Sequence, residues 1–131
     1  MHLPKRNPRQ EYRLKQREQI EASPLLAKKF PQLKALRVTL EFFEAAGSTK
    51  HGEMKFTVNT ELAKSELWFA CRGGECLGGD FDLSKPLAEA VAERRNTATG
   101  ELRCPGTRQR GGDEVVACRA LLRYKLKLGY D

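Results

Sequence analysis

The 131-residue chain has no long hydrophobic run, and no apolar stretch approaches the roughly 20 residues that a transmembrane helix needs. Its first residues, MHLPKRNPRQEY, carry charge without an apolar stretch behind them, so no secretory signal is expected and the cytoplasm is the predicted location. Hydrophobic residues still make up 40% of the chain, which is enough for a core. A folded domain is therefore the expectation.

The sequence also has few of the side chains and motifs on which enzymes depend. It contains two histidines, His2 and His51, and no Gly-x-Ser-x-Gly, Walker or His-Glu-x-x-His motif. His51 lies in a polar segment that predicts a solvated turn. Catalysis is not the leading interpretation, and a small enzyme acting on an anionic substrate remains only a third hypothesis.

Positive charge is abundant but unevenly distributed. Residues 1–37 hold ten Lys and Arg and three Asp and Glu, a net of 10 − 3 = +7, whereas residues 38–131 hold fourteen of each. The whole formal charge of +7 therefore lies in the N-terminal segment. This asymmetry favours a polyanionic partner, either RNA or DNA or an acidic protein surface, although it also suits a solubilising tail.

Residues 1–31 are predicted to form a basic arm, partly disordered and partly helical. The segment 9–22 is rich in good helix formers, and Arg9, Arg13 and Arg17 recur every four residues along one helical face. Residues 32–131 are predicted to form a single α+β domain.

Alternation of apolar and polar residues predicts an antiparallel sheet of about five strands in that domain. The expected strands cover residues 36–43, 54–58, 65–71, 101–104 and 115–130. The first two are expected to form a hairpin. A covering helix is predicted from Ser84 to about Arg95, with Leu87, Ala90 and Val91 on its buried face.

The clearest chemical signal comes from four cysteines, Cys71, Cys76, Cys104 and Cys118. A Gly-Gly pair lies midway in each half of the set, Gly73-Gly74 in the first and Gly111-Gly112 in the second. Because Gly-Gly suits tight turns, each pair of cysteines is predicted to face one another across a hairpin. Two such hairpins can deliver four thiolates to a tetrahedral zinc ion.

On these cysteines, and on the small residues that follow Cys76 and Cys104, residues 67–122 resemble the zinc-ribbon class of four-cysteine sites. The resemblance implies a structural zinc ion held by all four cysteines. Both spacings here, C-x4-C and C-x13-C, are longer than the C-x2-C of that class. The stretch C-x4-C-x-G-G-D-F-D-L also resembles small uncharacterised bacterial proteins, which have no assigned activity to transfer.

Two alternatives to the zinc site stay open at this point, namely buried free thiols and a pair of disulfides. Cysteines opposite each other on paired strands lie close enough to be oxidised. Without an export signal, free thiols and hence a metal are favoured over disulfides. Asp80 and Asp82 could ligate a second metal, but D-x-D before a helix is more typical of turn and capping chemistry.

The predicted function is a zinc-stabilised module that binds nucleic acid or a ribonucleoprotein. Its candidate contacts are basic side chains of the arm, of the glycine-rich loop and of the last strand's outer face: Arg9, Arg13, Arg17, Arg108, Arg110, Arg119, Arg123, Lys125 and Lys127. Phe43 and Trp68, out of phase with the core faces of their strands, could stack on bases. A protein-interaction adaptor without nucleic-acid binding is the alternative, and a solvated basic surface without any partner also fits the pattern.

Overall fold

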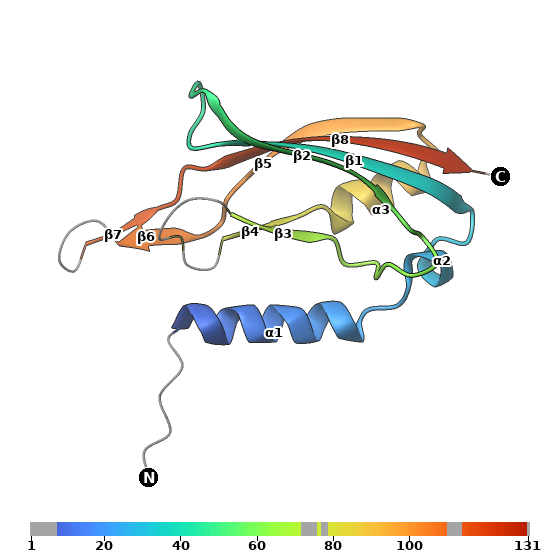
Figure 1. Cartoon of the computed structure of the whole chain (residues 1–131), viewed down its shortest axis with the longest axis horizontal. Helices are drawn as coiled ribbons and strands as arrows, with labels where there is room; N and C mark the ends of the chain where they lie inside the picture. Colours follow the sequence, from blue (N-terminus) through green and yellow to red (C-terminus); the bar gives the residue numbers. More distant parts are fainter. Residues whose placement is uncertain (1–7, 72–75, 77–78, 110–113, 131) are drawn as a thin grey trace, which may run out of the picture.

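A computed structural model describes residues 8–71, 76, 79–109 and 114–130, in which a four-stranded antiparallel sheet, two two-stranded sheets and three helices are arranged as an α+β fold (Figure 1). The strand order of the large sheet is β2-β1-β8-β5. In chain order the elements are α1 (Pro8–Ala22), α2 (Leu26–Lys29), β1 (Leu33–Phe43), β2 (Lys50–Val58), β3 (Trp68–Ala70), β4 (Asp80–Asp82), α3 (Ser84–Ala92), β5 (Thr97–Arg103), β6 (Thr107–Gln109), β7 (Val115–Ala117) and β8 (Leu121–Tyr130).

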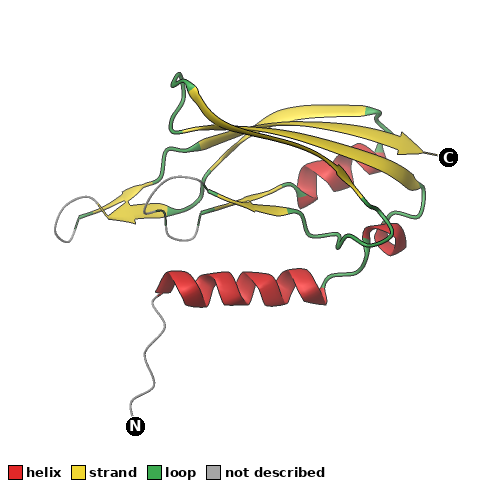
Figure 2. Ribbon diagram, viewed as in Figure 1, coloured by secondary structure: helices red, strands yellow, loops and turns green. Residues whose placement is uncertain are grey.

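Strands β1 and β8 lie at the centre of the large sheet, and in both of them buried residues alternate with exposed ones. The antiparallel register places Val38 opposite Leu126 and Phe42 opposite Leu122, so these buried side chains share one face. The predicted hairpin of β1 and β2 is confirmed, with Val38 opposite Phe56. Helix α3 and the small sheet β3–β4 lie on the buried face of the large sheet (Figure 2).

Helix α3 buries Leu87, Ala90 and Val91, as predicted. The N–H of Ser84 donates to Oδ1 of Asp82 at 2.8 Å, so Asp82 forms an Asx turn that leads into the helix. The helix ends earlier than the predicted Arg95. Arg94 adopts a φ of 48°, a left-handed conformation that ends helical hydrogen bonding.

The third expected strand, residues 65–71, does not extend the large sheet. Only Trp68–Ala70 is a strand there, and it pairs with Asp80–Asp82 in a separate sheet. This small sheet packs against the large one through aromatic side chains, because the ring of Phe81 meets that of Phe42 edge-on with centroids 6.3 Å apart. The large sheet consequently has four strands where about five were expected.

The last expected strand, residues 115–130, is divided into β7 and β8. Strand β7 pairs with β6, and β8 pairs with β5 in the same register, so the two pairs form one long hairpin with a break. Backbone hydrogen bonds continue across the break, from Cys104 N to the carbonyl of Ala120 at 3.0 Å and from Cys118 N to that of Gly106 at 2.9 Å. The interruption therefore coincides with the cysteines.

Helix α1 lies along the outer side of β3 and β4 (Figure 1). Nη1 of Arg13 lies 3.7 Å from Oδ1 of the buried Asp80, and Gln16 is only 7% exposed. Burial, together with the nearby Asp80 carboxylate, raises the pKa of Tyr12 to about 12. The separation of the chain into an arm and a domain at residue 31 stays a prediction.

None of the helices in the described part of the chain is long and apolar enough to span a bilayer.

Candidate metal centre

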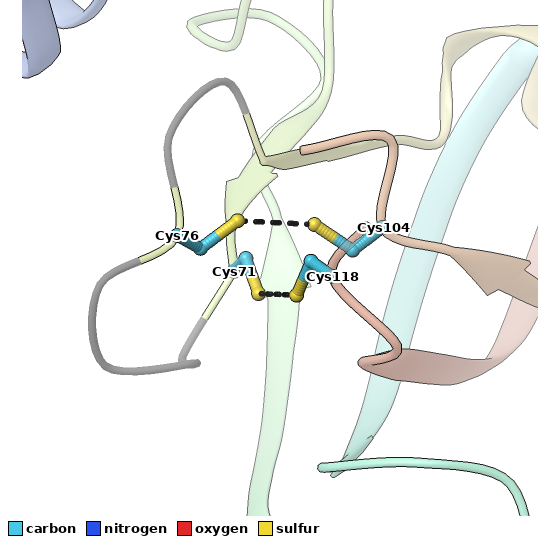
Figure 3. Close-up of side chains that lie close together, drawn as sticks. All are labelled: Cys71, Cys76, Cys104 and Cys118. Atoms are coloured by element: carbon cyan, nitrogen blue, oxygen red, sulfur yellow. Dashed lines mark hydrogen bonds between the residues drawn. The ribbon is translucent and has the colours of Figure 1, made fainter. Parts of the chain in front are cut away.

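The four cysteines converge at one end of the molecule, where the β3–β4 connection meets the break in the long hairpin (Figure 3). Their sulfur atoms all lie within 4.8 Å of one another. Each cysteine is buried, with 4–6% of its surface exposed. Residues up to 47 positions apart in the chain thus form one enclosed cluster.

The distances between the sulfur atoms fit a tetrahedral ion. Four sulfurs at the usual zinc–sulfur distance of about 2.3 Å form a tetrahedron with edges of about 3.8 Å. Cys71 Sγ lies 3.8 Å from Cys118 Sγ, and Cys76 Sγ lies 3.4 Å from Cys104 Sγ. Both distances are far longer than the roughly 2.0 Å bond of a disulfide. All four cysteines are present as reduced thiols rather than as disulfides.

The predicted register of the first hairpin is wrong. Cys71 does not face Cys76, because its N–H donates instead to the carbonyl of Gly79 at 3.0 Å. Cys76 lies in the connection between β3 and β4. The turn expected at Gly73-Gly74 falls outside the described residues.

The second hairpin forms as predicted, but its register differs by two residues, so Cys104 faces Ala120 and Cys118 faces Gly106. The turn at Gly111-Gly112 lies outside the described part of the chain. Because of this stagger the short sulfur contacts run between the two hairpins, from Cys71 to Cys118 and from Cys76 to Cys104 (Figure 3). The cluster therefore joins the two hairpins to each other.

Backbone N–H groups approach two of the sulfurs. Gly106 N donates to Cys104 Sγ at 3.4 Å, and the N–H of Ala120 donates to the sulfur of Cys118. In both cases the donor lies two residues after the cysteine. Such N–H···S bonds stabilise the negative charge of a thiolate, which is the state in which cysteine ligates metal.

Arg108 gives Cys118 a second donor. Its Nε donates to Cys118 Sγ at 3.3 Å. Burial raises the pKa of Cys76 to about 11 and also raises that of Cys104. At Cys118 burial acts in the same direction, but the N–H of Ala120 and the Arg108 guanidinium, together with neighbouring thiols, outweigh it and lower the pKa to about 7.

Gly79 is the residue of this centre that sequence reasoning missed. A Cβ added there would overlap Cys76 Sγ and lie 2.5 Å from Cys104 Sγ and 3.0 Å from Cys71 Cβ. The backbone of Gly79 therefore approaches the sulfurs more closely than any residue with a side chain could. The one signal in the sequence was that Gly79 belongs to a Gly-Gly pair, Gly78-Gly79, shortly after Cys76. That signal did not show that the cysteine sulfurs are the atoms next to Gly79.

The predicted basic contact residues are dispersed over the molecule. Arg123, Lys125 and Lys127 lie on the solvent side of β8, and Arg119 is exposed between β7 and β8. Arg17 of α1 is exposed, while Arg13 lies beside Asp80 and Arg108 lies against Cys118. Arg110 and the side chain of Arg9 are outside the described residues.

Both aromatic side chains proposed for base stacking have partners within the chain. The guanidinium of Arg123 lies 5.0 Å from the centre of the Phe43 ring. The indole N–H of Trp68 donates to Glu66 Oε2 at 2.8 Å. Sequence reasoning also did not select Arg37, which lies directly opposite Lys127 on the large sheet.

Comparisons with known proteins identify no relative. No protein-family model matches the chain, and neither a curated protein sequence nor a solved structure matches it significantly. The geometry of the site is that of a buried four-cysteine cluster suitable for a metal ion.

Proposed function

We propose that this chain is a zinc-stabilised module that binds nucleic acid through the solvent side of its four-stranded sheet. The observation that carries the proposal is a group of three exposed cations, Arg37, Lys125 and Lys127, which we call the basic patch. Within the described residues, no carboxylate lies within ion-pair distance of any of the three. Their charge is therefore available to a polyanion.

The donor set supports zinc as the metal. Four cysteine sulfurs in a tetrahedral arrangement suit zinc better than calcium, magnesium or manganese, which prefer oxygen ligands. Four thiolates also leave no open position on the ion, which supports a structural rather than a catalytic role. Free thiols persist in a reducing compartment, and a cytoplasmic protein is part of the same proposal.

The arrangement of the basic patch supports nucleic acid as the partner. Arg37 and Lys127 lie directly opposite each other on adjacent strands. Lys125 lies two residues before Lys127 on the same strand and on the same face. The patch borders a hollow of about 920 Å³ on the sheet surface, with Thr39 and Thr57 beside the cations. Lysine, arginine and threonine side chains are the usual donors to phosphate oxygens.

The metal part of the proposal is tested by native mass spectrometry of the purified full chain. We expect one zinc ion per chain and four thiols that react only after denaturation. A chain without metal whose four thiols react after denaturation would leave buried free thiols as the interpretation. A chain without reactive thiols would overturn the proposal in favour of disulfides.

The binding part is tested by fluorescence anisotropy with labelled oligonucleotides at increasing salt. We expect log affinity to fall linearly with log salt concentration, because bound phosphates release counterions. If the protein bound neither RNA nor DNA at 50 mM salt but bound polyglutamate, it would be an adaptor for acidic protein surfaces.

A further inference from the structure

A row of glutamates bounds the basic patch on the side nearer the cysteines. Glu53 of β2 lies opposite Glu41 of β1, Glu41 lies opposite Arg123 of β8, and Arg123 lies opposite Glu101 of β5. Because directly opposed residues share a face, these side chains cross the whole sheet on its solvent side. We call Glu41, Glu53 and Glu101 the glutamate row.

The glutamate row neutralises the cations nearest to it. Nζ of Lys50 lies 3.4 Å from Glu41 and 2.7 Å from Glu53. Nη2 of Arg123 lies 3.0 Å from Glu101. Of the basic side chains expected on the outer face of the last strand, Arg123 is therefore held in an ion pair, whereas Lys125 and Lys127 have none in the described part of the chain. Lys55 of β2 is also paired, with its Nζ 3.2 Å from Glu53. On its side of the glutamate row, the basic patch is therefore where this face offers cations without an ion pair among the described residues.

The size of the basic patch limits the length of nucleic acid that it can contact. Residues opposite each other on adjacent strands have Cα atoms about 5 Å apart, and alternate residues of one strand lie about 7 Å apart. Three cations within such distances suit about three phosphates of one strand. The second strand of a duplex lies across a groove about 6 to 12 Å wide, which would place its phosphates over the glutamate row or beyond the edge of the sheet.

Nothing in the patch is suited to reading bases. Its neighbours across the strands are Thr39, Thr57, Thr97 and Thr99. The aromatic residue on this face, Phe43, lies beyond the glutamate row and is covered by Arg123. Without an aromatic stacking platform, binding depends on phosphates, which are the same for every base.

We infer that the basic patch holds a short segment of single-stranded nucleic acid by its phosphates, without base specificity, and that the glutamate row ends the site on the side of the metal centre. This inference rests on the proposed function and adds the class of nucleic acid, the size of the footprint and its boundary.

The test uses the metal-loaded full chain and 12-nucleotide fluorescein-labelled probes: oligothymidylate, oligocytidylate, and a duplex of the same length. Each phosphate contact on a single strand contributes about −0.7 to the slope of log affinity against log salt. Three contacts predict a slope of about −2 for both single strands. Their affinities are expected to agree within threefold and to exceed that of the duplex.

Variants locate the footprint. Arg37→Gln or Lys127→Gln is expected to make the slope shallower by about 0.7, because one phosphate contact is lost. If the two proteins bind equally at 1 M salt, this difference corresponds to about eightfold weaker binding at 50 mM. Arg103→Gln is the matched control, because Arg103 is an exposed arginine of the same sheet opposite Leu121, beyond the glutamate row. It is expected to leave the slope unchanged.

A gain-of-function variant tests the boundary. Glu101→Gln removes the ion-pair partner of Arg123 and is expected to make the slope steeper by about 0.7. An unchanged slope would overturn the boundary. Thermal denaturation and metal content of each variant separate a lost contact from a lost fold.

The two levels of the proposal fail in different ways. If the wild-type protein bound none of the probes at 50 mM salt, the proposed function would be wrong. If it bound them but preferred the duplex, discriminated tenfold between the two single strands, or lost affinity in Arg103→Gln rather than Arg37→Gln, only the inference about the site would be wrong.

Discussion

The four-stranded sheet and the cysteine end of the molecule differ in what fills their interiors. The sheet is built from long strands whose core side chains, among them Leu36, Leu40, Leu122 and Leu126, are fully buried. The cysteine end, which comprises β3–β4, β6–β7 and the four cysteines, has strands of three residues each. Its two connections meet at sulfur atoms.

This difference indicates different sources of stability. Each leucine buried in the sheet contributes about 1.5–3 kcal/mol by the removal of apolar surface from water. Two-stranded hairpins as short as those of the cysteine end are marginal by themselves in water. Four cysteines that hold one ion would join β6–β7, which contributes no buried core side chain among the described residues, to β3–β4, which packs on the large sheet through Phe81. Metal binding is how small domains without a large apolar core compensate for their size.

The largest effect is expected when one of the four cysteines, the proposed zinc ligands, is removed. In Cys104→Ser we expect loss of stoichiometric zinc, because apparent binding free energies of about 10–16 kcal/mol in four-ligand sites depend on the complete set. Hydrogen exchange should accelerate most in β6 and β7 and less in β3 and β4, which keep the contact of Phe81 with Phe42, while β1 and β8 stay protected. Chelation of wild-type protein is the control and should give the same pattern. Equal acceleration in both regions would contradict the division.

The second prediction concerns a substitution in the core of the four-stranded sheet, which should reduce stability but leave zinc binding intact. Leu126→Ala should destabilise the protein by about 2–5 kcal/mol, because it leaves a cavity beside Val38 in the fully buried core. Urea denaturation measures this loss, and mass spectrometry should still find one zinc ion. Leu62→Ala, at a leucine that is 76% exposed, is the matched control and should change stability by less than about 0.5 kcal/mol. Loss of zinc in Leu126→Ala would show that the two regions are not independent.

A smaller effect is expected where the backbone touches the sulfurs. Gly79→Ala inserts a methyl group that overlaps Cys76 Sγ and crowds Cys104 Sγ, and such overpacking costs about 1–3 kcal/mol. We expect competitive chelator titration to give a zinc affinity about ten- to hundredfold weaker. Gly47→Ala, with nothing within 4 Å of the new atom but a φ of 79°, separates backbone strain from contact with the metal centre. Unchanged zinc affinity in Gly79→Ala would contradict the geometry.

The smallest of these effects concerns Arg108. Arg108→Gln removes the guanidinium that donates to Cys118 Sγ, and loss of such an outer partner is expected to weaken zinc binding about tenfold. The same titration measures it. Arg119→Gln, an exposed arginine next to Cys118 in sequence, is the control for the loss of charge alone. Equal effects in both variants would assign the role of Arg108 to its net charge rather than to the hydrogen bond.

Much of the large sheet could be predicted from sequence because its signal is local. In β1 and β8 the apolar residues recur at every second position, and this period defines a half-buried strand whatever it pairs with. The helix at 84–92 could also be predicted, because Leu87, Ala90 and Val91 are spaced to form one buried helical face. Strand β4 was missed because three residues, Asp80–Asp82, are too few to show a period.

The sequence predicted which four cysteines form the candidate site, but not the strand register that places them. Cys104 and Cys118 were correctly placed on one hairpin, yet the alternation that runs through residues 115–130 is the same on both sides of the break at 118–120 and does not reveal it. The one trace of Gly79 in the sequence, its place in a Gly-Gly pair after Cys76, does not reveal that the sulfurs are its neighbours. Such contacts depend on how the two hairpins lie in space.

The amino-acid sequence alone specifies the alternation that makes the large sheet, the four cysteines that form the cluster, and the excess of basic residues. The fold sets the contacts of Cys71 with Cys118 and of Cys76 with Cys104, and it brings Arg108 to a sulfur. It also pairs Arg123 with Glu101 but leaves Lys125 and Lys127 without an ion pair among the described residues. The reason is physical. Strand formation follows from side chains two positions apart, whereas sulfur contacts and ion pairs depend on the register between segments that are distant in the chain.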